Sequence, residues 1–268
     1  HRLLASVIGL LTAGLAAWIW ASESAGKPKR TGLIFIFATL LLMGVRTQGM
    51  FIVMASVAIC VLIYCLFKLA NSRDRLRWWA MIAFCAVLVQ GVLGGMRVTL
   101  AENQIGILHG ILAQSYFVLI CAIAVWTSKW WQNAKRADPA EQTFSLKWVY
   151  TIATAIIFTQ LFLGASMRHQ HAGLAVPDFP TAYGKWWPDS NPEALEGYNQ
   201  KRALAINWRD RTPVTKNQIY FHMAHRIMAI LVVTILVYTL MRTRRELPGG
   251  HCLCKLAWGW IVLVSMQA

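Results

Sequence analysis

The stretch WWAMIAFCAVLVQGVLGGM, residues 78–96, carries no charged side chain and is long enough to cross a membrane as a helix. Uncharged runs of the same kind lie at 3–22, 32–45, 50–67, 103–128, 148–167, 227–241 and 256–268. Most of them approach the roughly 20 residues that a spanning helix needs, although the run 32–45 is short. The sequence therefore predicts an all-α integral membrane protein with about eight spans.

The charges support this prediction. Only 14% of the residues are charged and 57% are hydrophobic, a balance that a soluble domain does not have. The formal net charge of +15 comes from basic clusters in alternate loops, at 27–30, 73–77, 129–147 and 242–255. Such clusters mark cytoplasmic loops, whereas the segment 168–218 nearly balances its seven basic residues with five acidic ones and belongs outside. The basic charge sets topology, so nucleic-acid binding is not expected.

Two short motifs recur along the chain. HRLLA at 1–5 opens the first predicted span, and HRIMA at 225–229 opens the seventh. QGVLG at 90–94 ends the fourth span, and QLFLG at 160–164 ends the sixth. Because each copy falls at the outer end of a span, the pattern predicts two related halves.

The spacing of the motifs predicts an inserted hairpin. Gln90 follows His1 by 89 residues, whereas Gln267 follows His225 by only 42. The difference equals two spans and a loop, so the first half is expected to carry an extra helical hairpin at about 24–70. The chain also opens and stops inside apolar runs, which suggests that further helices flank it.

Three histidines, His1, His109 and His225, open predicted spans at the outer side. One such histidine would be ordinary interfacial polarity, but three at one depth favour a ligand role. A neutral imidazole is a good axial ligand for haem iron, and two imidazoles on facing helices can clamp a haem between them. His1 and His109 are candidates for one pair, and the partner of His225 is expected beyond residue 268.

Further candidates surround these histidines. Arg2 and Arg226 could each bind a haem propionate, although snorkelling at a helix end explains either arginine equally well. His222 lies one helical turn before His225 and could be a second ligand, a proton carrier or a polar group of the boundary layer.

No Asp or Glu lies inside a predicted span, which disfavours a proton-coupled transporter. The uncharged Gln90 and Gln160 are expected to hydrogen-bond a neighbouring helix or a ligand. The six cysteines predict no disulfide framework, and the pair Cys252 and Cys254 is not expected to hold a metal.

These residues resemble the haem A synthase family. The likeness is carried by GASMRHQHAGLAVPDFP at 164–180, HMAHR at 222–226, QGVLGGMRV at 90–98 and LHG at 108–110. It covers most of the chain except the extra hairpin, and AGLAVPDFP is its most specific part. The resemblance implies a membrane oxidoreductase that converts the C8 methyl of haem O to the formyl of haem A for cytochrome oxidases.

The resemblance also implies that the two halves are similar four-helix bundles, each able to hold a haem, and it implies roles for individual residues. His1 and His109 would ligate the substrate haem in a catalytic half, and His225 would hold haem b in the second half. Arg97 and the outer segment would lie over the haem edges. The family's essential glutamate would stand three residues before His1, so no catalytic residue can be assigned within the chain.

The expected organisation is a first half at 1–128 with its hairpin at about 24–70, a cytoplasmic linker at 129–147 and a second half at 148–268. The localisation expected is the cell inner membrane, with the histidines and the segment 168–218 at the outer face. The expected partners are membrane lipid, haem O from a haem O synthase and an unidentified electron acceptor, and the oligomeric state stays open. A dihaem cytochrome b subunit that exchanges electrons with quinone is the main alternative, and a haem-free transporter is a weaker one.

Overall fold

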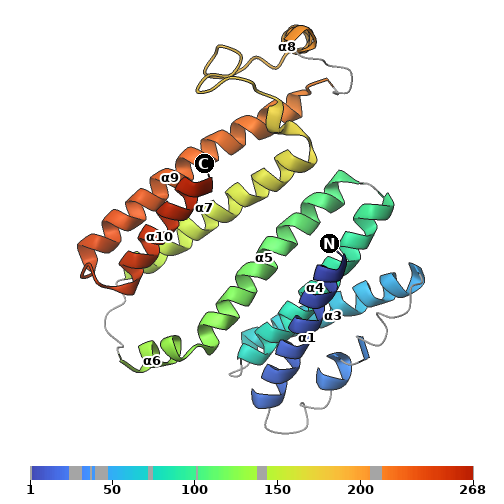
Figure 1. The fold of residues 1–268 in the computed structure, drawn as a ribbon, viewed down its shortest axis with the longest axis vertical. Coiled ribbons are helices and arrows are strands. Elements are labelled where there is room, and N and C mark those ends of the chain that lie inside the picture. Colours follow the sequence, from blue (N-terminus) through green and yellow to red (C-terminus); the bar gives the residue numbers. More distant parts are fainter. Residues whose placement is uncertain are drawn as a thin grey trace. The chain divides into compact units, whose positions relative to one another are not determined.

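The computed structural model of the chain describes residues 2–23, 32–36, 38–39, 48–71, 75–100, 102–137, 144–205 and 213–267. Its helices are α1 (Arg2–Glu23), α3 (Gln48–Asn71), α4 (Arg75–Leu100), α5 (Asn103–Thr127), α6 (Lys129–Ala137), α7 (Phe144–His169), the short 3-10 helix η1 (Ala172–Leu174), α8 (Pro192–Ala205), α9 (Lys216–Glu246) and α10 (Cys252–Gln267) (Figure 1). No strand occurs within these ranges, where one isolated bridge joins Ala182 and Lys185. The prediction of an all-α membrane protein is confirmed.

Six of the described helices are long and apolar enough to cross a membrane: α1, α3, α4, α5, α7 and α9. The seventh apolar helix, α10, is shorter. The protein is therefore a multi-pass membrane protein. Half of the short predicted span 32–45 lies outside the described residues, so the number of eight spans stays a prediction.

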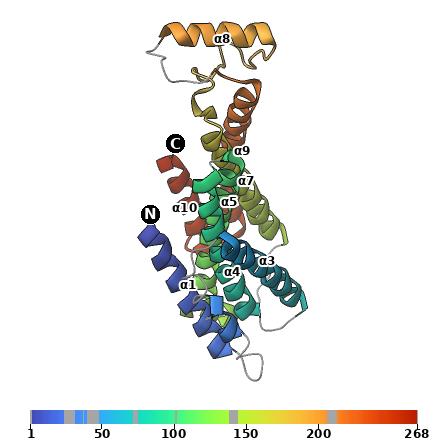
Figure 2. The same cartoon turned by 90° about the vertical axis from the view of Figure 1, so that its right-hand side faces the viewer.

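The chain divides into two compact units, 1–139 and 140–268, with the division inside the segment that the sequence marks as a linker. In the first unit, α4 is the central helix and packs against α1, α3 and α5. In the second unit, α9 packs against both α7 and α10. Each unit thus contains one hairpin that matters for the site, α4 with α5 and α7 with α9 (Figures 1 and 2).

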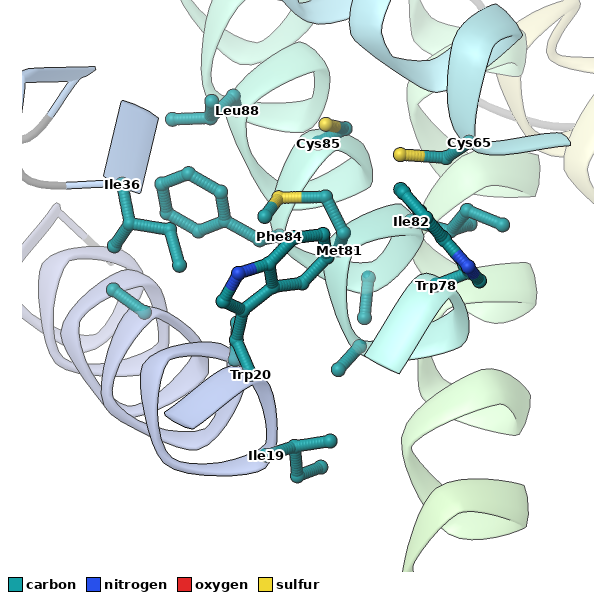
Figure 3. Packing of buried hydrophobic residues seen from close by; sticks show 14 of the residues in the cluster. Ile19, Trp20, Ile36, Cys65, Trp78, Met81, Ile82, Phe84, Cys85 and Leu88 are labelled. Atoms are coloured by element: carbon teal, nitrogen blue, oxygen red, sulfur yellow. The ribbon is translucent and has the colours of Figure 1, made fainter. Parts of the chain in front are cut away.

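The core of the first unit is built around the buried face of α4. Phe84 of α4, Trp20 of α1, Cys65 of α3 and Ile36, which precedes α3, belong to a single cluster (Figure 3). Lipid tails are as apolar as these side chains, so close packing, rather than removal from water, holds the helices together. Small residues such as Ala16 let the backbones approach.

Replacing Phe84 with alanine is expected to lower the free energy of unfolding by about 3 kcal/mol, because the ring leaves a cavity in a well-packed cluster. Phe84 is 1% exposed, whereas Phe117 of α5 is 67% exposed and serves as the matched control. The free energy of unfolding should be measured in mixed micelles by titration with SDS. Equal effects of Phe84→Ala and Phe117→Ala would show that the cluster does not stabilise this unit.

In the second unit, a partly buried polar contact ties α7, α9 and α10 together at the end away from η1. The Tyr150 hydroxyl of α7 lies 3.1 Å from Oγ1 of Thr243 on α9 and donates to the Leu253 carbonyl oxygen of α10 at 3.0 Å. At the other end, Thr215 and Gln218 form a capping box that starts α9. α8 lies beyond this second end of α7 and α9 and runs across their direction (Figures 1 and 2).

Candidate functional site

The loop-side end of the α4–α5 hairpin brings Gln90 against His109. The Gln90 amide nitrogen donates to the His109 carbonyl oxygen at 2.8 Å and lies 3.5 Å from Nε2 of the same residue's ring. Gly94 lies one turn after Gln90 on the same face of α4, where a Cβ atom would stand 3.2 Å from Cε1 of His109. The imidazole is therefore held between an amide and a bare stretch of backbone.

The α7–α9 hairpin repeats this arrangement. The Gln160 amide nitrogen lies 3.2 Å from Nε2 of His225. Gly164 follows Gln160 by one turn, and a Cβ atom on it would stand 3.3 Å from Cε1 of the His225 ring. Each hairpin thus places a glutamine, a glycine and a histidine in the same mutual geometry, although the two pairs of helices have different neighbours.

Both hairpins also leave the same polar atoms unpartnered. Nδ1 of His109 and Nδ1 of His225 are buried and have no hydrogen-bond partner among the described residues, and the same holds for Oε1 of Gln90 and Oε1 of Gln160. Buried polar groups are almost always paired, so atoms left without partners at matching positions mark a site built for a ligand. A histidine ring with one nitrogen on an amide and one free nitrogen suits axial ligation of a haem iron.

His222 and Arg226, the neighbours of His225 on α9, hold residues 170–184, which follow α7 and are called the joining segment below. Nδ1 of His222 lies 3.0 Å from the Ala172 carbonyl oxygen and 3.3 Å from the Val176 backbone nitrogen. Arg226 donates to the carbonyl oxygens of Thr181 at 3.0 Å and Val176 at 3.4 Å. In this structure both side chains hydrogen-bond the backbone of the joining segment. Their predicted haem contacts stay predictions.

The joining segment has a small core of its own. Val176 and Ala182 are buried against Ile219 and Met223 at the start of α9, and the Tyr183 ring stacks on that of Tyr198 from α8. The segment is thereby fixed over the loop-side end of its hairpin.

Asp178 closes a tight turn within this segment. Its carboxylate accepts hydrogen bonds from the Thr181 hydroxyl at 2.6 Å and from the backbone nitrogens of Tyr183 at 2.6 Å and Gly184 at 2.9 Å. Burial acts to raise the pKa of the Asp178 carboxyl, but these hydrogen bonds outweigh it and hold the pKa at about 2, below the ordinary value of 3.8.

Because the pKa of Asp178 is lowered by folding, the turn is stabilised above pH 4 and loses that stabilisation as the pH falls from about 4 to about 2. Limited pepsin digestion across this range should show cleavage near Asp178 rising as the pH falls. Asp178→Asn should remove most of the change. Asp189→Asn, at an exposed carboxylate paired with Lys185, is the control and should keep the wild-type profile. The same profile for Asp178→Asn and wild type would contradict this account of the turn.

The remaining predicted residues are placed as follows. His1 lies outside the described residues, and of Arg2 only the backbone, in α1, is described. Arg97 is exposed on α4, almost one turn beyond Gly94. The pairing of His1 with His109 therefore stays a prediction.

The cysteine pair at the start of α10 does not converge. Cys252 is exposed near His251, whereas buried Cys254 faces the carbonyl oxygens of Thr243 and Pro248. Within the described ranges, no three side chains of the metal-ligating types gather in one place.

Gly94 and Gly164 each lie against a histidine ring, a contact that sequence reasoning missed. Both stand in the repeated QxxxG motif, and their spacing from Gln90 and Gln160 puts each glycine on the face of its glutamine. That spacing was the available signal. The partner histidine across the hairpin became evident only from the fold.

Comparison with known proteins places this geometry in a family. The COX15-CtaA family model, described as cytochrome oxidase assembly protein, matches residues 43–268. The haem A synthase of Halalkalibacterium halodurans is 26% identical over 196 residues, which cover 70% of this chain and 56% of that protein. The haem A synthase of Rickettsia conorii is 28% identical over 225 residues, which cover 80% of this chain and 59% of that protein.

The chain thus spans a little over half the length of these curated relatives. No solved structure matches it significantly. The family match includes both Gln–Gly–His hairpins and begins before α3. The chain belongs to the COX15-CtaA family of cytochrome oxidase assembly proteins.

Proposed function

We propose that the protein is a haem A synthase, a membrane oxidoreductase that converts the C8 methyl of haem O to the formyl of haem A. The observation that carries the proposal is the pair of hairpins in which a glutamine and a glycine frame a histidine ring with one free, buried nitrogen. The names of the relatives support the same activity.

In this proposal the two histidines have different tasks. His109 ligates the substrate haem, and His225 ligates a haem b that carries electrons. The haem iron, when bound, supplies the oxidising chemistry, and the protein supplies ligation, orientation and shelter from water. His1 is the proposed second ligand of the substrate haem, and Arg97 lies on the helix that carries Gln90.

The joining segment is proposed to cover the second site. Arg226 and His222 fasten the segment to α9 within one turn of His225. A segment fixed in this way limits the access of water to a haem bound at His225. A rigid cover also restricts how that haem can tilt.

The proposed orientation in the membrane follows from the number of spans between the two sites. α5 and α7 are consecutive apolar helices, and the short α6 between them is too short to cross a membrane. The turns after α4 and α7 therefore share one face. Because the basic clusters lie at the opposite ends of these helices, the positive-inside rule assigns the histidines to the outer face of the cell inner membrane.

The reaction also requires partners. Oxidation of a methyl to a formyl group with water as the source of the oxygen atom releases electrons and protons, so an external electron acceptor is needed. The hydrophobic substrate would arrive through the membrane from a haem O synthase. Both partners are proposals.

Product analysis tests this function. The intact protein should be expressed with a haem O synthase in a host that makes no haem A, and its haems should be extracted with acid and separated by chromatography. Haem A or its hydroxylated precursor is the expected product. Unchanged haem O together with haem b would overturn the synthase activity and favour the electron-transfer alternative.

A further inference from the structure

We infer that Gln90 and Gln160 are positioning residues that set the orientation of the His109 and His225 imidazoles toward a bound haem, an inference that rests on the proposed function. Neither glutamine needs to touch the haem. Each acts through the histidine across its hairpin, and the glycine one turn later supplies the space in which the ring is held.

The repetition of the geometry is the first support. The amide-to-ring distances are 3.5 Å for Gln90 with His109 and 3.2 Å for Gln160 with His225. These contacts join different helices in two separately packed units. Chance packing of two amides would not place the same ring atom against each of them, with a bare glycine beside the same ring carbon.

The hydrogen-bond capacity of the groups is the second support. A neutral imidazole has one nitrogen that donates and one that accepts, and an amide can do both. When one ring nitrogen binds iron, the other carries the proton and needs an acceptor. The amide oxygen can be this acceptor, because Oε1 of Gln90 and Oε1 of Gln160 are buried and have no hydrogen-bond partner in the described part of the chain.

The orientation of the amide decides which of its atoms faces the ring. A half-turn of the imidazole exchanges each ring nitrogen with a ring carbon, so Nε2 meets the amide in the observed orientation, whereas a half-turn of the amide exchanges its oxygen and nitrogen. With the amide oxygen turned toward the ring, Nε2 carries the proton and donates to the glutamine, and Nδ1 is left for iron. An imidazole fixed in this way has a defined plane, and hydrogen bonding to its outer nitrogen makes it a stronger ligand.

The two glutamines differ in one respect that guides the experiment. Gln90 also donates to the His109 backbone carbonyl at 2.8 Å, so its removal would weaken the contact between α4 and α5 as well as the ring. Within the described residues, the polar contact of the Gln160 side chain with α9 is the one to the His225 ring. Gln160 is therefore the cleaner position for separating an effect on the ligand from an effect on the fold.

The glycines provide an independent test of the same inference. An alanine Cβ at Gly164 would stand 3.3 Å from Cε1 of His225, closer than almost all ordinary contacts, so the ring must shift relative to Gln160. Gly94→Ala should act on His109 in the same way. Gly91→Ala is its matched control, because a Cβ on Gly91 meets nothing within 4 Å.

The experiment uses the intact protein loaded with haem and compares wild type with Gln160→Met. Methionine keeps about the same length and volume of side chain, and its sulfur is only a weak acceptor for the ring N–H. Thr159→Val, at an exposed neighbour bonded only within α7, is the control. The readouts are the midpoint potential and electron paramagnetic resonance spectrum of the second-half haem and its rate of transfer to apomyoglobin.

Gln160→Met is expected to raise the midpoint potential, change the g-values and speed haem loss by about 10-fold, with Thr159→Val unchanged. Gly164→Ala should also change the g-values, although this variant retains Gln160. It is the second variant to measure if Gln160→Met does not fold. Wild-type potential, spectrum and haem loss in both variants would overturn the inference. Tighter haem binding in Gln160→Met would also overturn it, since the amide would then be a competitor of the haem. A wild-type protein without any haem would instead refute the proposed function itself.

Discussion

Replacing His109 with alanine is expected to reduce formation of haem A by at least about 100-fold while a haem b spectrum remains. Loss of a group that only orients a metal ligand costs 10- to 100-fold, and loss of the ligand itself should cost more. The haem b signal should survive because His225 lies in a separate unit and has its own glutamine and glycine. Extracted haems and the reduced-minus-oxidised spectrum should be measured on the same preparation.

The control for this variant is a histidine outside the hairpin geometry. His171 is exposed and has a positive φ of 53°, a conformation that asparagine tolerates well. His171→Asn should therefore retain both haem A formation and the haem b spectrum. Loss of both haem signals together in His109→Ala would contradict two separate sites.

The reciprocal variant, His225→Ala, is expected to remove the haem b spectrum. Haem A formation should fall at least about 10-fold, because the first site would lose its electron carrier while keeping its own ligand. Substrate haem should still bind, as measured by the haem O content of the purified protein. An unaltered haem b spectrum in His225→Ala would show that another residue ligates this haem.

The length of the uncharged runs predicted the spanning helices well. The uncharged run 78–96 lies inside α4, and the run 148–167 lies inside α7. An apolar segment in lipid becomes a helix because a helix satisfies its backbone hydrogen bonds within the segment. The boundaries of the apolar runs do not mark the helix ends, however. α9 begins at Lys216, well before the predicted run 227–241, since its polar first turns pack against the joining segment.

Local signals for two missed features were present in the sequence. Thr215 and Gln218 have the spacing of a capping box and mark the true start of α9. Asn191 followed by Pro192 marks the start of α8, where the Asn191 side chain accepts from the Ala194 backbone nitrogen at 2.8 Å. Reading 168–218 only by its charge balance concealed both signals.

The contacts of the candidate site could be predicted only in part. The repeated motifs identified Gln90 and Gln160 as a matched pair, and the common position of the histidines selected His109 and His225. Which glutamine meets which histidine depends on how two helices pack across a hairpin, and sequence spacing does not determine that. The contacts of Arg226 with backbone carbonyls were equally unpredictable, because a carbonyl acceptor leaves no trace in the sequence.

The most direct test of the account is the reduced-minus-oxidised spectrum of the purified intact protein, recorded together with that of the His109→Ala, His225→Ala double variant. The account predicts haem α and Soret bands in the wild type and the loss of haem ligated by both hairpins in the double variant. A wild type without haem bands, or a double variant with the wild-type spectrum, would contradict the claim that the two hairpins are haem sites.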